Sequence, residues 1–292
     1  KKCSVLMYPE ASYSFDGTAT PLPRKMGVLL KKLGTCVKPE EVTDNGSRNL
    51  HAVQSVEFGG YEIKNYHSPL VSFGRGKILE FDNNTVSVTC TNRMKMAHRV
   101  EPYEREGDPF SFIVPGKFLN EIIKILDDSD EEVRLCLSSK HIVFETEKCK
   151  IISSLLDGQF LNYKGFIPKE FKTTVKVKPN DFRRLIERAS VIIIDNGKLK
   201  TPIRLSIEDE KIIVSCKNEH NQTFIDEMKV KTEGLNLEIG FNNRILLETI
   251  SACEDEEVTL NFNSSLSSLC VLPKEGNSFV FLVSPMRLND NK

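Results

Sequence analysis

The sequence predicts an α+β fold built from repeated globular domains, and three observations support that prediction. Residues 113–135 and 239–260 each combine a strand end, an amphipathic helix, an acidic turn and a new strand. The two copies lie much farther apart than the roughly 20 to 50 residues of solenoid repeats, so the repeated unit is a whole domain. The length of 292 residues fits two domains of about 150 residues each. Short alternating strands dominate the pattern between these copies.

Strands are predicted wherever apolar and polar residues alternate or a short apolar run occurs. Such segments lie at residues 86–90, 133–137, 142–144, 174–177, 203–207, 212–214, 235–239, 258–262 and 279–283. Turn-forming clusters at residues 82–84, 208–210 and 274–277 separate pairs of these strands. The pattern therefore indicates sheets connected by tight turns.

Helices are predicted by four amphipathic segments, two in each domain. Each segment carries apolar residues at the i, i+3, i+4, i+7 spacing of a helix that packs on a core. The segments are residues 23–33, 115–126, 179–190 and 242–253. In the third, for example, the apolar stripe consists of Phe182, Leu185, Ile186 and Ala189.

The outward faces of these helices lean basic although the chain has a formal net charge of −1. A solvated helix surface is the ordinary explanation, because each helix also carries acids such as Glu121, Glu187 and Glu248. Alternatively, the helices gather positive charge because they bind the phosphate backbone of a nucleic acid without contacting the base edges. The candidate DNA-binding residues are Lys25, Lys32, Lys117, Lys124, Arg183, Arg184, Arg188 and Arg244.

Catalytic and metal chemistry have little support in the sequence. The eight cysteines are scattered singly, which predicts reduced thiols in a cytosolic protein rather than a zinc site or disulfides. The five histidines stand apart, and nucleotide-binding and hydrolase motifs are absent. The acidic run at residues 127–132 reads as a solvated turn. We therefore expect no cofactor, no metal and no membrane span.

Four segments carry a resemblance to a known family. Residues 112–121, residues 153–163 with 167–171, residues 237–242 and residues 283–288 resemble the bacterial sliding clamp, the beta subunit of DNA polymerase III. Their order and spacing hold over roughly residues 77–288. The resemblance implies a DNA-clamp fold, in which each domain has two β-sheets with two α-helices on the inner face. It also implies a ring of six domains around duplex DNA.

The resemblance also implies a domain assignment. Residues 1–172 resemble the middle clamp domain, with a divergent N-terminal part and an insertion at about residues 38–76, and residues 173–292 resemble the C-terminal domain. Clamps of this family have three domains per chain and close as dimers. Either a first domain is missing from this chain, or a natural two-domain chain needs three copies to supply six domains.

A peptide-binding pocket between the two domains is the second feature that the resemblance implies. Ordinary core and interdomain packing is the alternative explanation for Leu79, Leu266 and Leu282. Arg93 replaces a family glycine and Ser284 a family methionine, which changes the pocket's lining. The carried-over pocket residues are Leu79, Thr91, Arg93, Met94, Lys95, Met96, Leu161, Phe166, Ile245, Leu266, Ser268, Leu282, Ser284, Pro285, Met286 and Arg287.

Three function classes follow from these observations. The leading one is a non-catalytic processivity factor in the cytoplasm, associated with the nucleoid, that self-associates into a ring around double-stranded DNA. It would bind DNA polymerase and the clamp loader through their short peptide motifs. The second is a clamp-like interaction hub that does not load on DNA. The third is an unrecognised enzyme.

Overall fold

The computed structural model describes residues 4–7, 76–92, 94–103, 108–126, 133–138, 140–146, 149–193, 202–218 and 220–288. The predicted helix at 23–33, the predicted insertion at 38–76 apart from its last residue, the acidic turn at 127–132, and Lys25, Lys32 and Arg93 lie outside these residues. Two compact units make up the chain, Lys1–Asn92 with His98–Asn162 and Arg93–Ala97 with Tyr163–Lys292. The domain ranges 1–172 and 173–292 stay a prediction.

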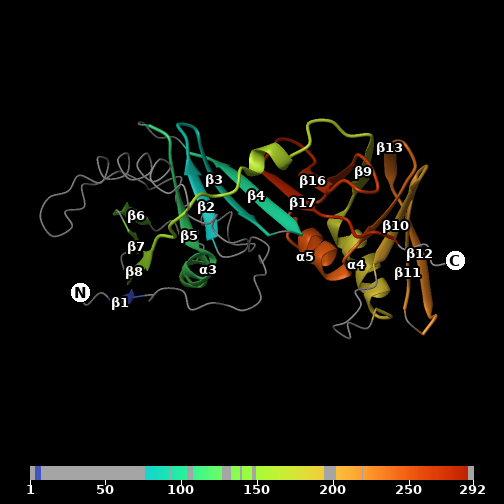
Figure 1. Cartoon of the computed structure of the whole chain (residues 1–292), viewed down its shortest axis with the longest axis horizontal. Coiled ribbons are helices and arrows are strands. Elements are labelled where there is room, and N and C mark those ends of the chain that lie inside the picture. Colours follow the sequence, from blue (N-terminus) through green and yellow to red (C-terminus); the bar gives the residue numbers. More distant parts are fainter. Residues whose placement is uncertain are drawn as a thin grey trace, which may run out of the picture. The chain divides into compact units, whose positions relative to one another are not determined.

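The first unit contains two sets of strands and the helix α3 (Figure 1). One sheet has the order β1-β8-β7-β6, with β1 parallel to β8 and the other pairs antiparallel. The other strands follow the order β4-β3-β2-β5. The elements are β1 (Ser4–Met7), β2 (Gly76–Phe81), β3 (Thr85–Thr91), β4 (Lys95–Pro102), β5 (Phe110–Pro115), α3 (Gly116–Ile125), β6 (Arg134–Leu137), β7 (His141–Glu145) and β8 (Cys149–Ser154).

The core of the first unit forms on one face of β2 and β5. Phe81 stacks on Phe110 with ring centroids 4.7 Å apart, and Phe112 continues the aromatic row. The helix α3 follows Pro115 and buries the predicted apolar stripe, including Leu119 and Ile122. Phe81, Phe112, Leu119 and Ile122 are fully or almost fully shielded and Phe110 is half-buried, so the apolar positions of the sequence form this core.

The second unit has two sheets and two α-helices among its described residues. One sheet has the antiparallel order β12-β11-β10-β14, and the other strands follow the order β13-β9-β15-β16-β17. The elements are the 3-10 turn η1 (Tyr163–Phe166), β9 (Thr173–Val177), α4 (Pro179–Ser190), β10 (Ile203–Glu208), β11 (Lys211–Lys217), β12 (Thr223–Lys229), β13 (Lys231–Gly234), β14 (Leu237–Phe241), α5 (Asn243–Ser251), β15 (Val258–Phe262), β16 (Leu269–Pro273) and β17 (Phe279–Val283).

Helices α4 and α5 pack side by side in the second unit (Figure 1). Pro179 occupies the first turn of α4, where its missing N–H leaves no hydrogen bond unmade. Asn242 caps α5, because its side-chain oxygen accepts from the Ile245 N–H at 3.2 Å. Asn243 Nδ2 donates to Ser190 Oγ at 3.2 Å and joins the two helices. The α+β prediction is confirmed, and no described helix has the length and apolar character to cross a membrane.

The strand predicted at 235–239 is wrong at its start. Strand β14 begins at Leu237, and Leu235 lies in the connection before it with 67% of its surface exposed. Gly234 has φ +109, and a Cβ there would lie 2.0 Å from the Lys172 carbonyl oxygen. The chain turns at this glycine, so the apolar Leu235 cannot continue a strand.

The described cysteines, which lie at 90, 136, 149, 216, 253 and 270, are free thiols. Cys3 and Cys36 fall outside the described residues. Burial raises the pKa of Cys216 to about 11 and that of Cys270 to about 12. Because the thiolate is the reactive form, these two side chains act as small apolar residues of the core.

Candidate functional site

In the first unit, the residues predicted to line the peptide-binding pocket are mostly buried. Leu79 is 1% exposed and pairs across the sheet with Val88 and Phe112. Thr91 ends β3, where its hydroxyl donates to the Asn92 carbonyl at 3.1 Å. Leu161 is half-buried in the chain just before η1. Leu79 therefore contributes to the core of its own unit, as the packing alternative allowed.

A short segment, residues 93–97, belongs to the second unit although the chain around it belongs to the first. The Met94 carbonyl accepts from the Ser284 N–H at 2.9 Å. Ala97 packs against the core of the second unit, and Met96 is only 6% exposed. These contacts bring Met94, Lys95 and Met96 together with the C-terminal residues of the predicted site.

The C-terminal residues 284–288 are held against β14. Met286 donates its N–H to the Gly240 carbonyl at 2.8 Å, and the two residues form an antiparallel bridge. A Cβ at Gly240 would lie 2.8 Å from the Met286 carbonyl oxygen and 2.6 Å from Leu288 Cδ2. The glycine therefore allows the close approach of the two chains, and it leaves Met286 half-buried and Arg287 exposed.

Two large apolar residues of the predicted site are exposed. Leu266 is 72% exposed and Phe166 is 57% exposed. The turn that carries Leu266 is braced by the Ser264 hydroxyl, which accepts from the Leu266 N–H at 3.3 Å and hydrogen-bonds Ser267 Oγ at 2.7 Å. These hydrogen bonds hold the backbone of the turn, so the turn itself loses little freedom when a partner covers Leu266. Leu282 is buried in β17, and Ser268 and Pro285 are half-buried.

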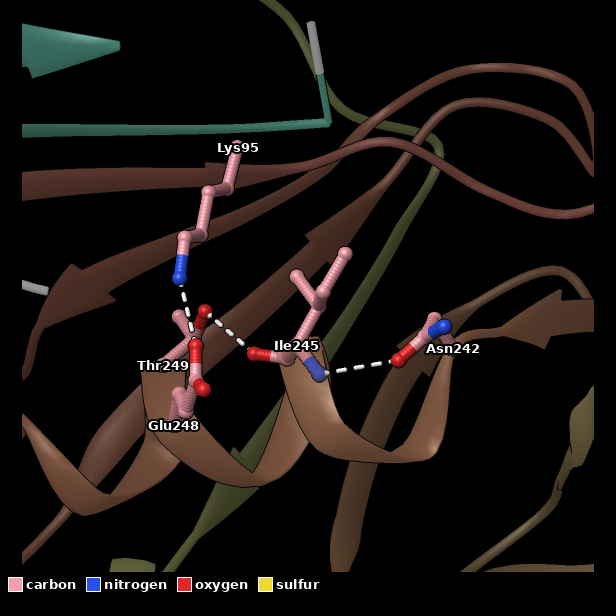
Figure 2. A network of polar contacts seen from close by, with 5 residues as sticks. All are labelled: Lys95, Asn242, Ile245, Glu248 and Thr249. Atoms are coloured by element: carbon pink, nitrogen blue, oxygen red, sulfur yellow. Dashed lines mark hydrogen bonds and ion pairs between the residues drawn. The ribbon is translucent and has the colours of Figure 1, made fainter. Parts of the chain in front are cut away.

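Helix α5 joins these residues to a polar network that sequence reasoning missed (Figure 2). Ile245 has side-chain partners on both backbone groups, because Thr249 Oγ1 donates to its carbonyl at 2.9 Å and Asn242 accepts from its N–H. One turn on, Glu248 Oε2 accepts from Lys95 Nζ at 2.5 Å. The capping Asn242 was visible in the sequence as an Asn just before an apolar helix. The Lys95–Glu248 pair had no sequence signal.

The helix-face cations are only partly available to a ligand. In α3, Lys117 is exposed, and Lys124 pairs with Glu121 at 2.7 Å. Arg244 is exposed on α5. Helix α4 carries three arginines against Asp181 and Glu187, so its formal excess is one positive charge. By formal charge, α3 and α4 each carry an excess of one positive charge and α5 carries none, so binding of DNA by these helices stays a prediction.

The three arginines of α4 differ in their surroundings. Arg183 Nε lies 3.7 Å from Glu187 and is buried without a hydrogen-bond partner in the described part of the chain. Arg188 donates to Asp226 Oδ2 from Nε at 2.9 Å and from Nη2 at 2.6 Å. Hydrogen bonding from Arg188 lowers the pKa of Asp226. Arg184 is exposed and has no ion-pair partner among the described residues. Of the three arginines of α4, Arg184 is thus the most accessible to a phosphate group.

Metal-binding residues do not gather in the described parts of either unit. Among those residues, no group of three or more His, Cys, Asp or Glu side chains could hold a metal ion. His98 hydrogen-bonds Thr89 Oγ1 at 2.8 Å inside the first unit, as a structural histidine does. The described residues offer exposed apolar side chains and exposed helix cations.

Two protein-family models match this chain. A model described as DNA polymerase III beta subunit, central domain, matches residues 72–162. A second, described as DNA polymerase III beta subunit, C-terminal domain, matches residues 164–287. This chain belongs to the DNA polymerase III beta-subunit family. Resemblance to the second and third domains of the sliding clamp is thereby confirmed, in the predicted order.

Individual relatives agree with the family models. The "Beta sliding clamp" of Staphylococcus epidermidis is 28% identical over 206 residues, which cover 70% of this chain and 54% of that protein. A DnaN sliding clamp from Pseudomonas aeruginosa bound to griselimycin superposes with a TM-score of 0.70 at 26% identity, over 76% of this chain and 60% of that chain. The beta subunit from Thermotoga maritima gives a TM-score of 0.68 at 25% identity, over 74% and 58%. The chain spans about half the length of the curated relatives it matches.

Proposed function

We propose that this protein acts as a sliding clamp, a non-catalytic processivity factor that encircles duplex DNA and tethers DNA polymerase and other partners through short peptide motifs. The proposal is carried by one observation: the chain contains two consecutive clamp domains, and the second unit contains most of the residues predicted to bind peptides. The backbone groups of Met94, Met286 and Ile245 each make hydrogen bonds, and Leu266 and Phe166 are exposed, the latter within η1.

Peptide binding follows from the chemistry of these side chains. Methionines adapt to different partners because their side chains are unbranched and polarizable. Exposed Leu266 and Phe166 supply apolar area, and Arg287 offers an exposed cation for a polar group of the peptide. The griselimycin complex of the Pseudomonas aeruginosa clamp supports the idea that this fold accommodates a compact ligand.

Self-association is supported by an exposed edge strand in the second unit, which carries one exposed apolar side chain among polar ones. Strand β12 lies at the end of the sheet order β12-β11-β10-β14, and its Ile225 is 73% exposed. Val191, just after α4, is 80% exposed, and α4 packs against β12. An exposed edge strand with apolar side chains is ready to pair with another chain. We propose that this edge contributes to a ring, formed either by three two-domain chains or by a dimer of longer chains.

The peptide site gives the first test. A polymerase-tail peptide with apolar and aromatic residues near its end should bind with micromolar affinity, about −8 kcal/mol. Met286→Ala and Leu266→Asp should each weaken it about tenfold, because a few apolar anchors carry most of such an affinity. Calorimetry with the intact chain measures the three dissociation constants.

Leu235→Asp is the matched control, because Leu235 is also exposed in the second unit and is not a predicted site residue. Its affinity for the peptide should equal that of the wild type. If the peptide binds all four proteins equally well, the partner site lies elsewhere on the chain.

The alternative function is an interaction hub that binds peptides without enclosing DNA. Pairing of Lys124, Arg183 and Arg188 with neighbouring acids favours it, because paired cations attract phosphate less strongly. The two functions share the peptide site and differ in whether DNA is retained once salt removes electrostatic binding.

A further inference from the structure

The Lys95–Glu248 ion pair joins two residues of the second unit that are 153 positions apart in the sequence. Its cation is shielded, since only 10% of the Lys95 side chain is exposed, whereas 38% of the Glu248 side chain is exposed. The paired cations Arg188 and Lys274, by contrast, keep 54% and 58% of their side chains exposed. Because the Lys95 ammonium is largely withdrawn from water, its contact with the carboxylate is screened less than that of a pair whose two members are both exposed. This pair can therefore help to hold the two chain segments together.

Glu248 is presented by α5, a helix with a capped N-terminus. The helix begins after the Asn242 cap. Within the helix, the Thr249 hydroxyl donates a hydrogen bond to the Ile245 carbonyl, one turn earlier in the chain. Glu248 follows Ile245 by three residues, so both side chains lie on neighbouring parts of one helix face (Figure 2). The carboxylate thus has a defined position relative to a predicted peptide residue.

Lys95 sits between two methionines of the predicted peptide site. The Met94 carbonyl is fixed by the Ser284 N–H, and the Met96 side chain is buried. The reach of Lys95 to Glu248 adds a side-chain connection to this backbone connection (Figure 2). The segment 94–96 is therefore held to α5 as well as to the C-terminal residues.

We propose that Glu248 is a positioning residue of the peptide site: by holding Lys95, it fixes Met94 and Met96 relative to Ile245. The proposal rests on the peptide-binding function argued above. It assigns no peptide contact to Glu248 itself. Loss of the carboxylate removes the connection to α5, and the segment 94–96 then samples more positions. Ordering this segment again on binding costs affinity.

The first readout needs no peptide. Hydrogen–deuterium exchange of the free chain should become faster at residues 94–97 in Glu248→Gln, which removes the charge and keeps the side-chain shape. Glu238→Gln is the matched control, because Glu238 pairs with Arg204 on the other sheet of the same unit and is 47% exposed. Exchange at residues 94–97 should stay at the wild-type rate in that variant. Unchanged exchange in Glu248→Gln would overturn the proposal whether or not the peptide binds.

The second readout is a double-mutant cycle on peptide affinity. Glu248→Gln and Lys95→Met should each weaken the polymerase-tail peptide about tenfold, and the double variant should be no weaker than Lys95→Met alone. The swapped pair Lys95→Glu with Glu248→Lys should recover part of the lost affinity.

Equal additional loss from Glu248→Gln in the Lys95→Met background would overturn the proposal, because Glu248 would then act independently of Lys95. A wild-type chain that binds no peptide would instead refute the peptide function. In that case exchange at residues 94–97 alone decides whether Glu248 holds the segment.

Discussion

Replacing Lys77 by Met should stabilise the protein at pH 7, by on the order of 1–3 kcal/mol. Lys77 is 4% exposed, and its Nζ has no hydrogen-bond partner within the described part of the chain. It lies on β2 in the same alternating row as Leu79 and Phe81 and pairs with Val114 across the sheet. A lysine thus occupies a core position, where methionine of similar length can pack without a charge.

The stabilisation should depend on pH. Burial lowers the pKa of Lys77 in the folded chain, so the unfolded chain holds the proton more tightly. The penalty is therefore complete below the folded-state pKa and disappears as pH rises through the unfolded value of about 10.4. Urea unfolding of wild type and Lys77→Met should show a larger difference at pH 7 than near the unfolded value of about 10.4, where the difference should have nearly vanished.

Lys140→Met serves as the control, because Lys140 is exposed in the same unit and its substitution should change stability little. A loss of stability in Lys77→Met at pH 7 would show that the lysine has a favourable partner in the folded protein and that the account of this core position is wrong.

Charge reversal at Arg184 should weaken DNA binding more than neutralising Arg188. Arg184 is exposed, whereas Arg188 already donates two hydrogen bonds to Asp226. Each phosphate contact contributes about one unit to the slope of log affinity against log salt. Arg184→Glu should therefore lower the affinity for every duplex sequence and reduce that slope by about one.

Fluorescence anisotropy with a labelled duplex over a range of salt concentrations measures both quantities. Arg188→Gln is the comparison, and its slope should stay close to the wild-type value. An affinity that does not change with salt, or an equal loss in both variants, would remove α4 from the DNA-binding surface.

Much of the second unit was predictable because local and tertiary preferences agree there. The stripe Phe182, Leu185, Ile186 and Ala189 is buried in α4 as its spacing predicted, and the strands predicted at 258–262 and 279–283 are β15 and β17. Strand β12 was missed because its residues face outward or are only half-buried, so charged residues dilute the alternation.

Buried charges and the polar contacts of the candidate site were harder to predict than the fold. A hydrophobicity pattern assigns a lysine such as Lys77 to the surface, and only the strand register places it in the core. The partnership of Lys95 with Glu248 depends on chain segments brought together by folding, which no local spacing encodes. The family resemblance supplied residues such as Met286, and the structure supplied the hydrogen bond to Gly240 that fixes it.

The central claim is enclosure of DNA, and topological retention tests it most directly. The protein is allowed to thread onto a linear duplex with biotinylated ends, the ends are then blocked with streptavidin, and the complex is washed at high salt. A ring stays on the blocked duplex after electrostatic binding is lost, and it is released when a restriction enzyme cuts the DNA. Complete loss from blocked and open duplexes alike at high salt would contradict enclosure and leave the peptide-binding hub.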